Sequence, residues 1–558
     1  MPWIERLKKF RSNLGLCDRL LLLLITASFI LRLSLINQDI SVILNKFLPD
    51  DAYIYYTVAK NIINGRGIVF NYGIPANGFH PFYVLILVPI FKLLYPYGVN
   101  LPIYASLFIM TIFSLGTSVF VYLIVSKLLN KKAGLLAAFI WLFNPCILFV
   151  SFMGMETPIQ IFFISLLTYF ILTKEDRTQF SIHESVIIGL LVGIIFLSRM
   201  DGIFIGIGVI SALAIRKLAK NKGLEIANLK RLFNYKEPDL VIIILTASLT
   251  ILPWVAWNLI RVGRITPISG EVLRMMRLSG TPYSHLVIGS IYVTGTFVVN
   301  FFMYPLSLVS LYGPLVKPII GFSIVFLALG VPFIILMRKK DDILSKLIFS
   351  LDFLVISSIF YYAFYWFYQL GLRGWYSLYT SFLVTITFSI MIVQIIQRIK
   401  FKKFKQIAYI LLMCLLLSAF VSGGIMTYKE GNYPQEKLKW EIANYLDENI
   451  PFNETIGSFN TGIYQYYTKN HDVINLDGVM NPEAYQAMKD GNIEMYILEK
   501  NITYIVDDPS DVEKLNRSIL DLELIKTFEM PYYSYKDGEG MKISKLFKVA
   551  PVKMPGQK

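Results

Sequence analysis

Long uninterrupted runs of apolar residues dominate the first three quarters of the chain. Three runs, Asp18–Asn37, Asn100–Val125 and Gln406–Thr427, are long enough to cross a bilayer, which needs about 20 helical residues. Shorter apolar runs with polar breaks lie between them. The pattern predicts an α-helical polytopic membrane protein with about eleven transmembrane helices.

The apolar runs also predict where each helix lies. One stretch, Phe79–Tyr95, contains Pro89 and Lys92 and is short for a span, so we expect it to dip into the membrane and return. The expected helices are 18–37, 100–126, 133–152, 158–173, 185–198, one beginning near Gly202, 238–258, 314–337, 347–369, 375–397 and 406–427.

Charge gives these helices a direction. Only 16% of the residues are charged, against about 25% in soluble domains. The net charge of +15 does not indicate nucleic-acid binding, because the basic residues form short clusters between apolar runs. The positive-inside rule places such clusters in the cytoplasm. We therefore expect a multi-pass protein of the cell membrane with a cytoplasmic N-terminus. The clusters are Glu5–Arg11, Lys127–Lys132, Arg216–Lys236, Arg338–Lys346 and Arg398–Lys405.

The last part of the chain, 429–558, is different in character. It is polar and carries a net negative charge, and helical and strand patterns alternate in it as in a small α/β domain. Three N-x-S/T triplets, at Asn453, Asn501 and Asn516, fit exposure outside the cytoplasm. The expected elements are a helix over 435–448, strands over 455–459 and 472–476, a helix over 482–500 and a strand over 502–506.

We therefore divide the chain into a transmembrane domain, 1–428, and an external α/β domain, 429–558. The transmembrane domain includes a first external loop, 38–99, and a second external segment, 261–313. The three cysteines form no disulfide framework, and no pair of them has the spacing of metal ligands.

Carboxylates that this topology places on the external side are the first candidates for chemistry. Asp50 and Asp51 open a helix in the first external loop, and Glu156 lies in a short external turn before Pro158. Each has an ordinary explanation in helix capping and the helix dipole. As an alternative, one member of the Asp pair could act as a general base, and Glu156 could position an acceptor hydroxyl or hold a divalent cation.

External arginines are the second set of candidates. Arg199 and Asp201 interrupt two apolar runs, and Arg373 lies in another such break beside Tyr376. Arginine suits a lipid phosphate because its planar fork makes bidentate contacts. The alternatives are an Arg–Asp pair at a helix junction, and an arginine that snorkels in an interfacial aromatic belt. Weaker candidates in the first loop are Arg66, Asn77 and His80.

The joint order of these motifs resembles the GT-C superfamily of membrane glycosyltransferases. It is similar to arabinofuranosyltransferases, protein O-mannosyltransferases and lipid A aminoarabinose transferases. The resemblance aligns Asp51 with the superfamily's first-loop Asp, and Glu156 with its second external acid. Oligosaccharyltransferases have Asp-x-Asp where this chain has one Glu, so metal dependence stays open. The motifs are Asp50–Tyr53, Ala59–Asn61, Gly65–Gly67, Asn77–Pro81, Gly154–Pro158 and Ser198–Gly202.

The resemblance implies transfer of a sugar from a polyprenyl-phosphate donor to an acceptor hydroxyl at the outer face of the membrane. The partners would be membrane lipid and a glycan, lipid or protein acceptor, with no nucleic acid. No cofactor is required, although a divalent cation stays an option. A secondary transporter or flippase is the alternative; such proteins usually show internal repeats, and this sequence has none. A non-catalytic scaffold with an external binding domain is the third class.

Overall fold

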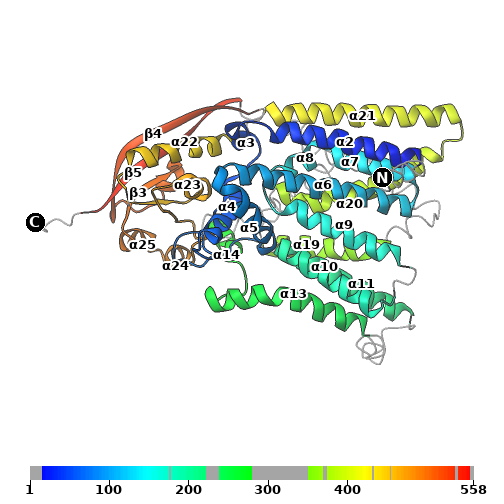
Figure 1. Cartoon of the computed structure of the whole chain (residues 1–558), viewed down its shortest axis with the longest axis horizontal. Helices are drawn as coiled ribbons and strands as arrows, with labels where there is room; N and C mark the ends of the chain where they lie inside the picture. The colour runs from blue at the N-terminus through cyan, green and yellow to red at the C-terminus, as the bar shows by residue number, and fades with distance from the viewer. Residues whose placement is uncertain are drawn as a thin grey trace, which may run out of the picture.

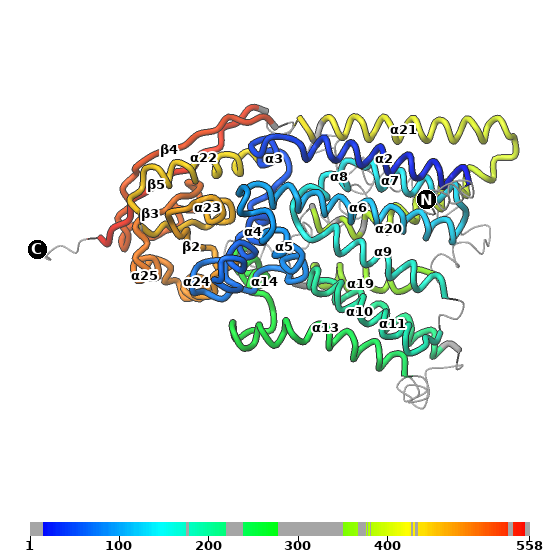
Figure 2. The backbone as a smooth tube through the Cα atoms, in the orientation of Figure 1, coloured from blue at the N-terminus to red at the C-terminus, as the bar shows by residue number. Residues whose placement is uncertain are grey.

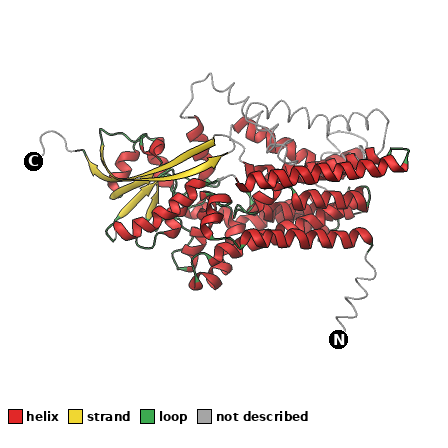
Figure 3. Cartoon of the chain, turned by 90° about the horizontal axis from the view of Figure 1, so that it is seen from above, coloured by secondary structure: helices red, strands yellow, loops and turns green. Residues whose placement is uncertain are grey.

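A computed structural model describes residues 15–174, 178–220, 238–278, 350–368, 374–429, 433–452, 454–534 and 538–552. Roughly parallel helices form a bundle, and a sheet with short helices lies beyond one end of it (Figure 1). Viewed at 90° to the first orientation, the strands again occupy one end only (Figure 3). The chain is therefore a helical membrane part with an α/β part at one end.

The bundle is built from the apolar runs, and its helices fall close to the expected positions. Apolar side chains are buried between helices and also exposed on the outside, for example Leu415 on the last bundle helix, as expected for a surface that faces lipid. The helices are α2 (Leu16–Ile36), α6 (Leu101–Leu128), α7 (Lys131–Phe143), α8 (Pro145–Ser151), α9 (Thr157–Thr173), α10 (Ile182–Ser198), α11 (Ile203–Lys220), α13 (Asp239–Arg261), α19 (Asp352–Tyr368), α20 (Leu378–Gln397) and α21 (Lys402–Lys429).

Within the described ranges, four helices are long and apolar enough to cross a membrane: α2, α6, α13 and α21. The pair α7 and α8 would make a fifth span, bent by 56°. We expected one helix over 133–152, and the structure divides it at Asn144 into α7 and α8. Asn144 ends α7 and accepts a hydrogen bond from the Cys146 amide at 2.9 Å, while Pro145 cannot continue the α7 hydrogen-bond pattern. The expected helix over 314–337 lies outside the described residues.

The first external loop folds into helices against the end of the bundle. They are α3 (Ile40–Lys46), α4 (Asp50–Ile63), α5 (Pro81–Leu94) and a 3₁₀ turn at Tyr95–Tyr97. In the second external segment, α14 (Ile268–Leu278) lies near α4 (Figure 1). Asn61 donates hydrogen bonds to the carbonyl oxygens of Val69 and Phe70, at 3.0 and 2.9 Å, and so closes the loop after α4.

The C-terminal part contains a five-stranded sheet in the order β2-β1-β3-β5-β4. Strands β2, β1 and β3 are parallel, with Ile456 opposite both Val473 and Tyr504, while β5 is antiparallel to β3 and β4. Its elements are α22 (Pro434–Asn449), β1 (Thr455–Ser458), α23 (Gly462–Tyr467), β2 (Val473–Asn475), α24 (Pro482–Lys489), α25 (Ile493–Glu499), β3 (Ile502–Asp507), α26 (Pro509–Val512), β4 (Leu520–Ser534) and β5 (Gly538–Pro551).

Two features of this part differ from the sequence prediction. The expected helix over 482–500 is broken into α24 and α25, because Gly491 adopts a left-handed conformation with φ of 70°. The hairpin of β4 and β5 was not predicted, although Leu520, Leu522 and Leu524 alternate with acidic residues as in a strand.

The two parts share one continuous hydrophobic core, which runs from the bundle through α4 into α23 and β1. Lys60 donates to the Tyr466 carbonyl oxygen at 2.8 Å, and the Asn71 side chain bonds backbone atoms of Val473 and Asn475 at 2.8 and 2.9 Å. Figure 2 shows α4, from the first part of the sequence, beside α23, from the C-terminal part. The division at 428/429 is therefore a change of composition and not a break in packing.

Candidate functional site

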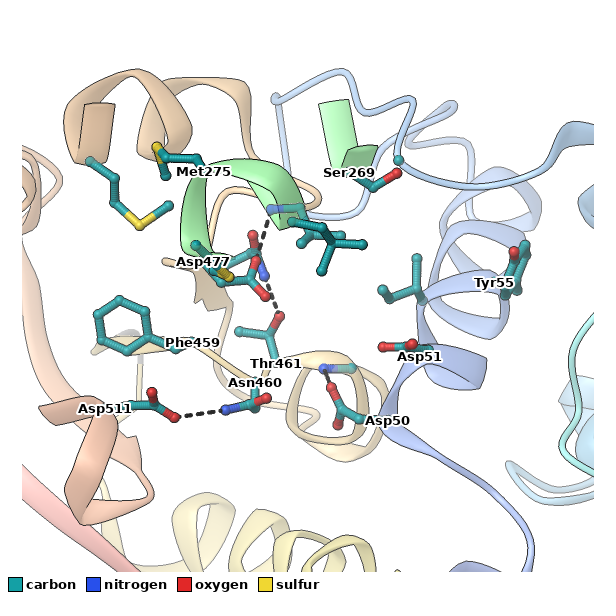
Figure 4. Close-up of a pocket in the computed structure, with 18 of the residues that line it drawn as sticks. Asp50, Asp51, Tyr55, Ser269, Met275, Phe459, Asn460, Thr461, Asp477 and Asp511 are labelled. Atoms are coloured by element: carbon teal, nitrogen blue, oxygen red, sulfur yellow. Dashed lines mark hydrogen bonds between the residues drawn. The ribbon is translucent and has the colours of Figure 1, made fainter. Parts of the chain in front are cut away.

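A cavity of about 1010 Å³ lies where one end of the helix bundle meets the C-terminal sheet. One side of the cavity is formed by α4 and α14, together with the turn before α9 and the first residue after α10. The other side comes from the loops that follow β1, β2 and β3 (Figure 4). Segments more than 400 residues apart in the sequence thus enclose one space.

The two adjacent acids of α4 have different surroundings. Asp50 accepts hydrogen bonds from the amides of Gly462 and Ile463, at 2.8 and 3.0 Å, and forms an ion pair with Lys439 at 3.2 Å. Asp51 is exposed and lines the cavity, and its carboxylate points into the space in Figure 4. Asp50 thus holds the C-terminal part, whereas Asp51 is exposed to the cavity.

The second acid, Glu156, belongs to a buried ionic cluster. It is fully buried at the start of α9, and its Oε1 atom accepts from Nη1 of Arg199 at 2.6 Å. The other end of the same guanidinium pairs with Asp201 at 2.9 Å. Within the described chain, Oε2 of Glu156 is buried without a hydrogen-bond partner. The expected Arg–Asp pair at the helix junction is present, and it includes Glu156 as well.

Aromatic and amide side chains complete the surroundings of the cluster. Gln160 donates to Asp201 at 2.9 Å, and the Tyr376 ring lies 4.5 Å from the Arg199 guanidinium carbon. Nε2 of His80 lies 3.8 Å from Glu156 Oε1. Burial lowers the pKa of His80, so the imidazole is neutral at pH 7. Glu156 and Asp201 thus share one guanidinium, with His80 and Tyr376 beside it.

The remaining predicted residues lie elsewhere. Arg66 is exposed, with its guanidinium 6.0 Å from the Tyr72 ring, and it does not line the cavity. Asn77 is buried and bonds the backbone of Thr266 and Ile268, both at 3.2 Å, so it holds the start of α14. Arg373 lies outside the described residues.

The C-terminal part adds residues that the sequence did not single out. Asn460, Thr461 and Asp477 follow β1 and β2 and line the cavity, together with Asp511 and Lys514 after β3. Burial, together with the nearby carboxylates of α4, raises the pKa of Asp477 to about 7. The only available signal was position, because Asp477 directly follows the predicted strand over 472–476.

Residues 80–257 match the family model described as dolichyl-phosphate-mannose-protein mannosyltransferase. The structure is similar to the oligosaccharyltransferase of Archaeoglobus fulgidus in the apo form, with a TM-score of 0.52 and 16% identity over 88% of this chain and 69% of that one. It is also similar to ArnT from Cupriavidus metallidurans bound to undecaprenyl phosphate, with a TM-score of 0.53 and 11% identity over 94% of this chain and 97% of that one. The chain has the GT-C fold.

The GT-C fold accounts for the membrane helices and the folded first loop. It does not account for the C-terminal part. Residues 427–544 match a family described as a domain of unknown function (DUF8728). Among curated proteins, no sequence matches this GT-C chain significantly.

Proposed function

We propose that this protein transfers a sugar from a polyprenyl-phosphate donor to an acceptor hydroxyl at the outer face of the membrane. The observation that carries the proposal is the position of Asp51. It is an exposed carboxylate in a large cavity between the ends of the membrane helices and the C-terminal part. The GT-C fold and the lipid phosphate bound to the structurally similar ArnT support the choice of donor.

In the proposed reaction, Asp51 accepts the proton of the acceptor hydroxyl while that oxygen attacks the anomeric carbon. The new oxygen–carbon bond forms as the bond from the anomeric carbon to the phosphate oxygen breaks. The bonding electrons leave with the lipid phosphate, which departs as an anion. The products are the glycosylated acceptor, protonated Asp51 and the polyprenyl phosphate.

The departing phosphate needs a cation, and the sequence already favoured Arg373 over Arg199 for it, because Asp201 could hold Arg199 in a structural pair. In the structure, the Arg199 guanidinium binds Glu156 and Asp201. We therefore assign Arg199 primarily to holding Glu156 in place, with phosphate binding as its lesser role. Arg373 remains the first candidate for the phosphate, since a guanidinium that stabilises charge developing on the leaving oxygens lowers the barrier.

A divalent cation at this site would need several oxygen ligands that converge. No group of three His, Cys, Asp or Glu side chains with such an arrangement occurs among the residues the structure describes. In addition, one oxygen of Glu156 is occupied by Arg199. The donor set does not fit a resident metal, and we derive no step through one.

The test uses purified protein in nanodiscs with radiolabelled polyprenyl-phosphate sugars, beginning with mannose. Release of free polyprenyl phosphate together with a labelled acceptor supports the proposal, and Asp51→Asn should abolish both. Movement of the labelled lipid between leaflets in proteoliposomes, without cleavage of the sugar–phosphate bond, would contradict it and support a flippase.

A further inference from the structure

The parallel strands of the C-terminal sheet end at the cavity. From β1 the chain passes through α23 to β2 on one side, whereas β3 pairs with the opposite side of β1. In sheets of this kind, ligands bind in the crevice beyond the carboxyl ends, at the point where the connections diverge. The loops there contribute Asn460, Thr461 and Asp511 to the cavity wall.

A buried carboxylate fixes this part of the wall. Asp507, at the end of β3, accepts hydrogen bonds from the Ser458 hydroxyl at 2.8 Å and the Phe459 amide at 2.5 Å. The Asn460 side chain donates to Asp507 and also to Asp511, at 3.1 and 3.2 Å. The polar groups after β1 and β3 are thus held in position before any ligand arrives.

The loop after β2 places a carboxylate on the same wall. Oδ1 of Asp477 accepts from the Val479 amide at 2.8 Å, in a turn whose Gly478 has φ of 78°. A Cβ at Gly478 would approach the Tyr485 backbone to 2.8 Å, so the turn is tightly packed. Figure 4 shows Asp477 and Asp51 on separate elements around one space.

The composition of this wall indicates the chemistry of its ligand. Carboxylate and amide groups alternate with apolar surfaces from Phe459, Met488 and Leu515. The wall has two lysines, Lys489 and Lys514, and two carboxylates, Asp477 and Asp511, so it carries no excess positive charge for an anionic ligand, and Lys514 is paired with Asp511 at 2.5 Å. Hydroxyl groups and apolar C–H faces occur together in sugar rings. The whole cavity is at the upper end of the usual range of about 300–1000 Å³, which suits two substrates.

We propose that the carboxyl ends of β1, β2 and β3 form the acceptor site and that it takes a neutral, hydroxyl-rich carbohydrate, with Asp477 accepting a hydrogen bond from one sugar hydroxyl. The role of this carbohydrate as the acceptor rests on the proposed function. Its binding at this site does not rest on it. The site gives the C-terminal part a role in substrate recognition.

Binding is measured without donor, by saturation-transfer-difference NMR of the full chain in nanodiscs. The probes are mannobiose, cellobiose and chitobiose, with glucuronic acid as an anionic comparison. We expect at least one neutral disaccharide to bind at pH 8, above the pKa of Asp477, and Asp477→Asn to weaken its binding about tenfold or more, since a hydrogen bond to an ionised carboxylate is replaced by a weaker one to an amide oxygen. Asp521→Asn, an exposed change on β4 away from the cavity, is the matched control.

Three outcomes would overturn the proposal: no neutral disaccharide binds, the anionic sugar binds better, or Asp477→Asn binds as the unaltered protein does. The two readouts separate this proposal from the proposed function, because disaccharide binding is measured without donor and transfer is measured with it. If disaccharides bind through Asp477 and no lipid-phosphate sugar is ever cleaved, the proposed function fails and the binding site stands.

Discussion

At the scale of single residues, the two adjacent acids of α4 should behave differently. Asp51→Asn removes the proposed base and should lower transfer about 10²–10⁴-fold with an unchanged melting temperature. Asp50→Asn should lower the melting temperature, because Asp50 binds two amides of α23 and Lys439. Radiolabelled transfer and thermal unfolding of both variants check this. Transfer near the normal rate in Asp51→Asn would remove it from the proposed role.

The Arg199 cluster gives a second residue-scale prediction. Arg199→Ala leaves Glu156 and Asp201 buried with uncompensated charge, which should destabilise the protein by about 3–5 kcal/mol. Arg199→Lys should recover part of the loss, since lysine supplies charge without the fork. The measurement is the midpoint of denaturant unfolding. The triple variant Glu156→Gln, Arg199→Met and Asp201→Asn, which removes all three charges, serves as a control: recovered stability without recovered transfer would show that the cluster also matters for activity.

Asp477 gives a residue-scale prediction about pH. In the unfolded chain this carboxyl ionises near pH 4, whereas its pKa in the folded protein is about 7. The folded state therefore keeps a proton that the unfolded state releases. Its contribution to stability is complete below pH 4 and is lost as the pH rises through 7. The melting temperature should fall between pH 5 and 7.5, and Asp477→Asn should reduce that slope. An equal slope in both proteins would contradict the raised pKa.

At the scale of elements, the contact between α4 and α23 requires a glycine. A Cβ at Gly462 would collide with the Asp50 carbonyl oxygen, so Gly462→Ala should separate the two helices. We expect a lower melting temperature and a higher KM for the acceptor, with a smaller change in donor affinity. Gly424→Ala on α21 is the control, because nothing lies within 4 Å of its added methyl group. Equal effects of the two changes would argue against a close α4–α23 contact.

The individual elements also show how much of the fold and of the site could be predicted from the sequence. The length of the apolar runs predicted most of the bundle helices that the structure describes, because an apolar stretch of about 20 residues has few alternatives to a membrane-spanning helix. The bend at Asn144 was missed, although Pro145 marks it. From the sequence, Asp50 and Asp51 form one pair, because both lie at the same helix start. They differ because Asp50 contacts Gly462, which lies more than 400 residues away. Only the folded chain brings Asp477 to the same cavity as Asp51.

At the scale of the whole molecule, the charges divide between the two ends of the bundle. Asp18, at the start of α2, pairs with Lys131, at the start of α7, at 2.7 Å. The connection between α20 and α21 lies at that same end, opposite the sheet (Figure 1). From the positive-inside rule we propose that this end lies in the cytoplasm, which would make the cavity open on the outer side. The proposed function needs this orientation, because a donor whose head lies at the outer face must reach Asp51.

Cysteine labelling in intact cells tests the orientation. In a background without Cys17, Cys146 and Cys414, Lys403→Cys should react with a membrane-impermeant maleimide only after the membrane is opened. Asp521→Cys, on β4, should react in intact cells. Lys403 lies in the first turn of α21 and Asp521 in the C-terminal part beyond its end, and the 28 residues of α21 span about 42 Å at 1.5 Å per residue, enough to cross the hydrocarbon core. Labelling of both positions from the same side would show that α21 does not cross the membrane. Labelling of Lys403→Cys alone in intact cells would place the cavity in the cytoplasm, where an outer-face donor could not reach it.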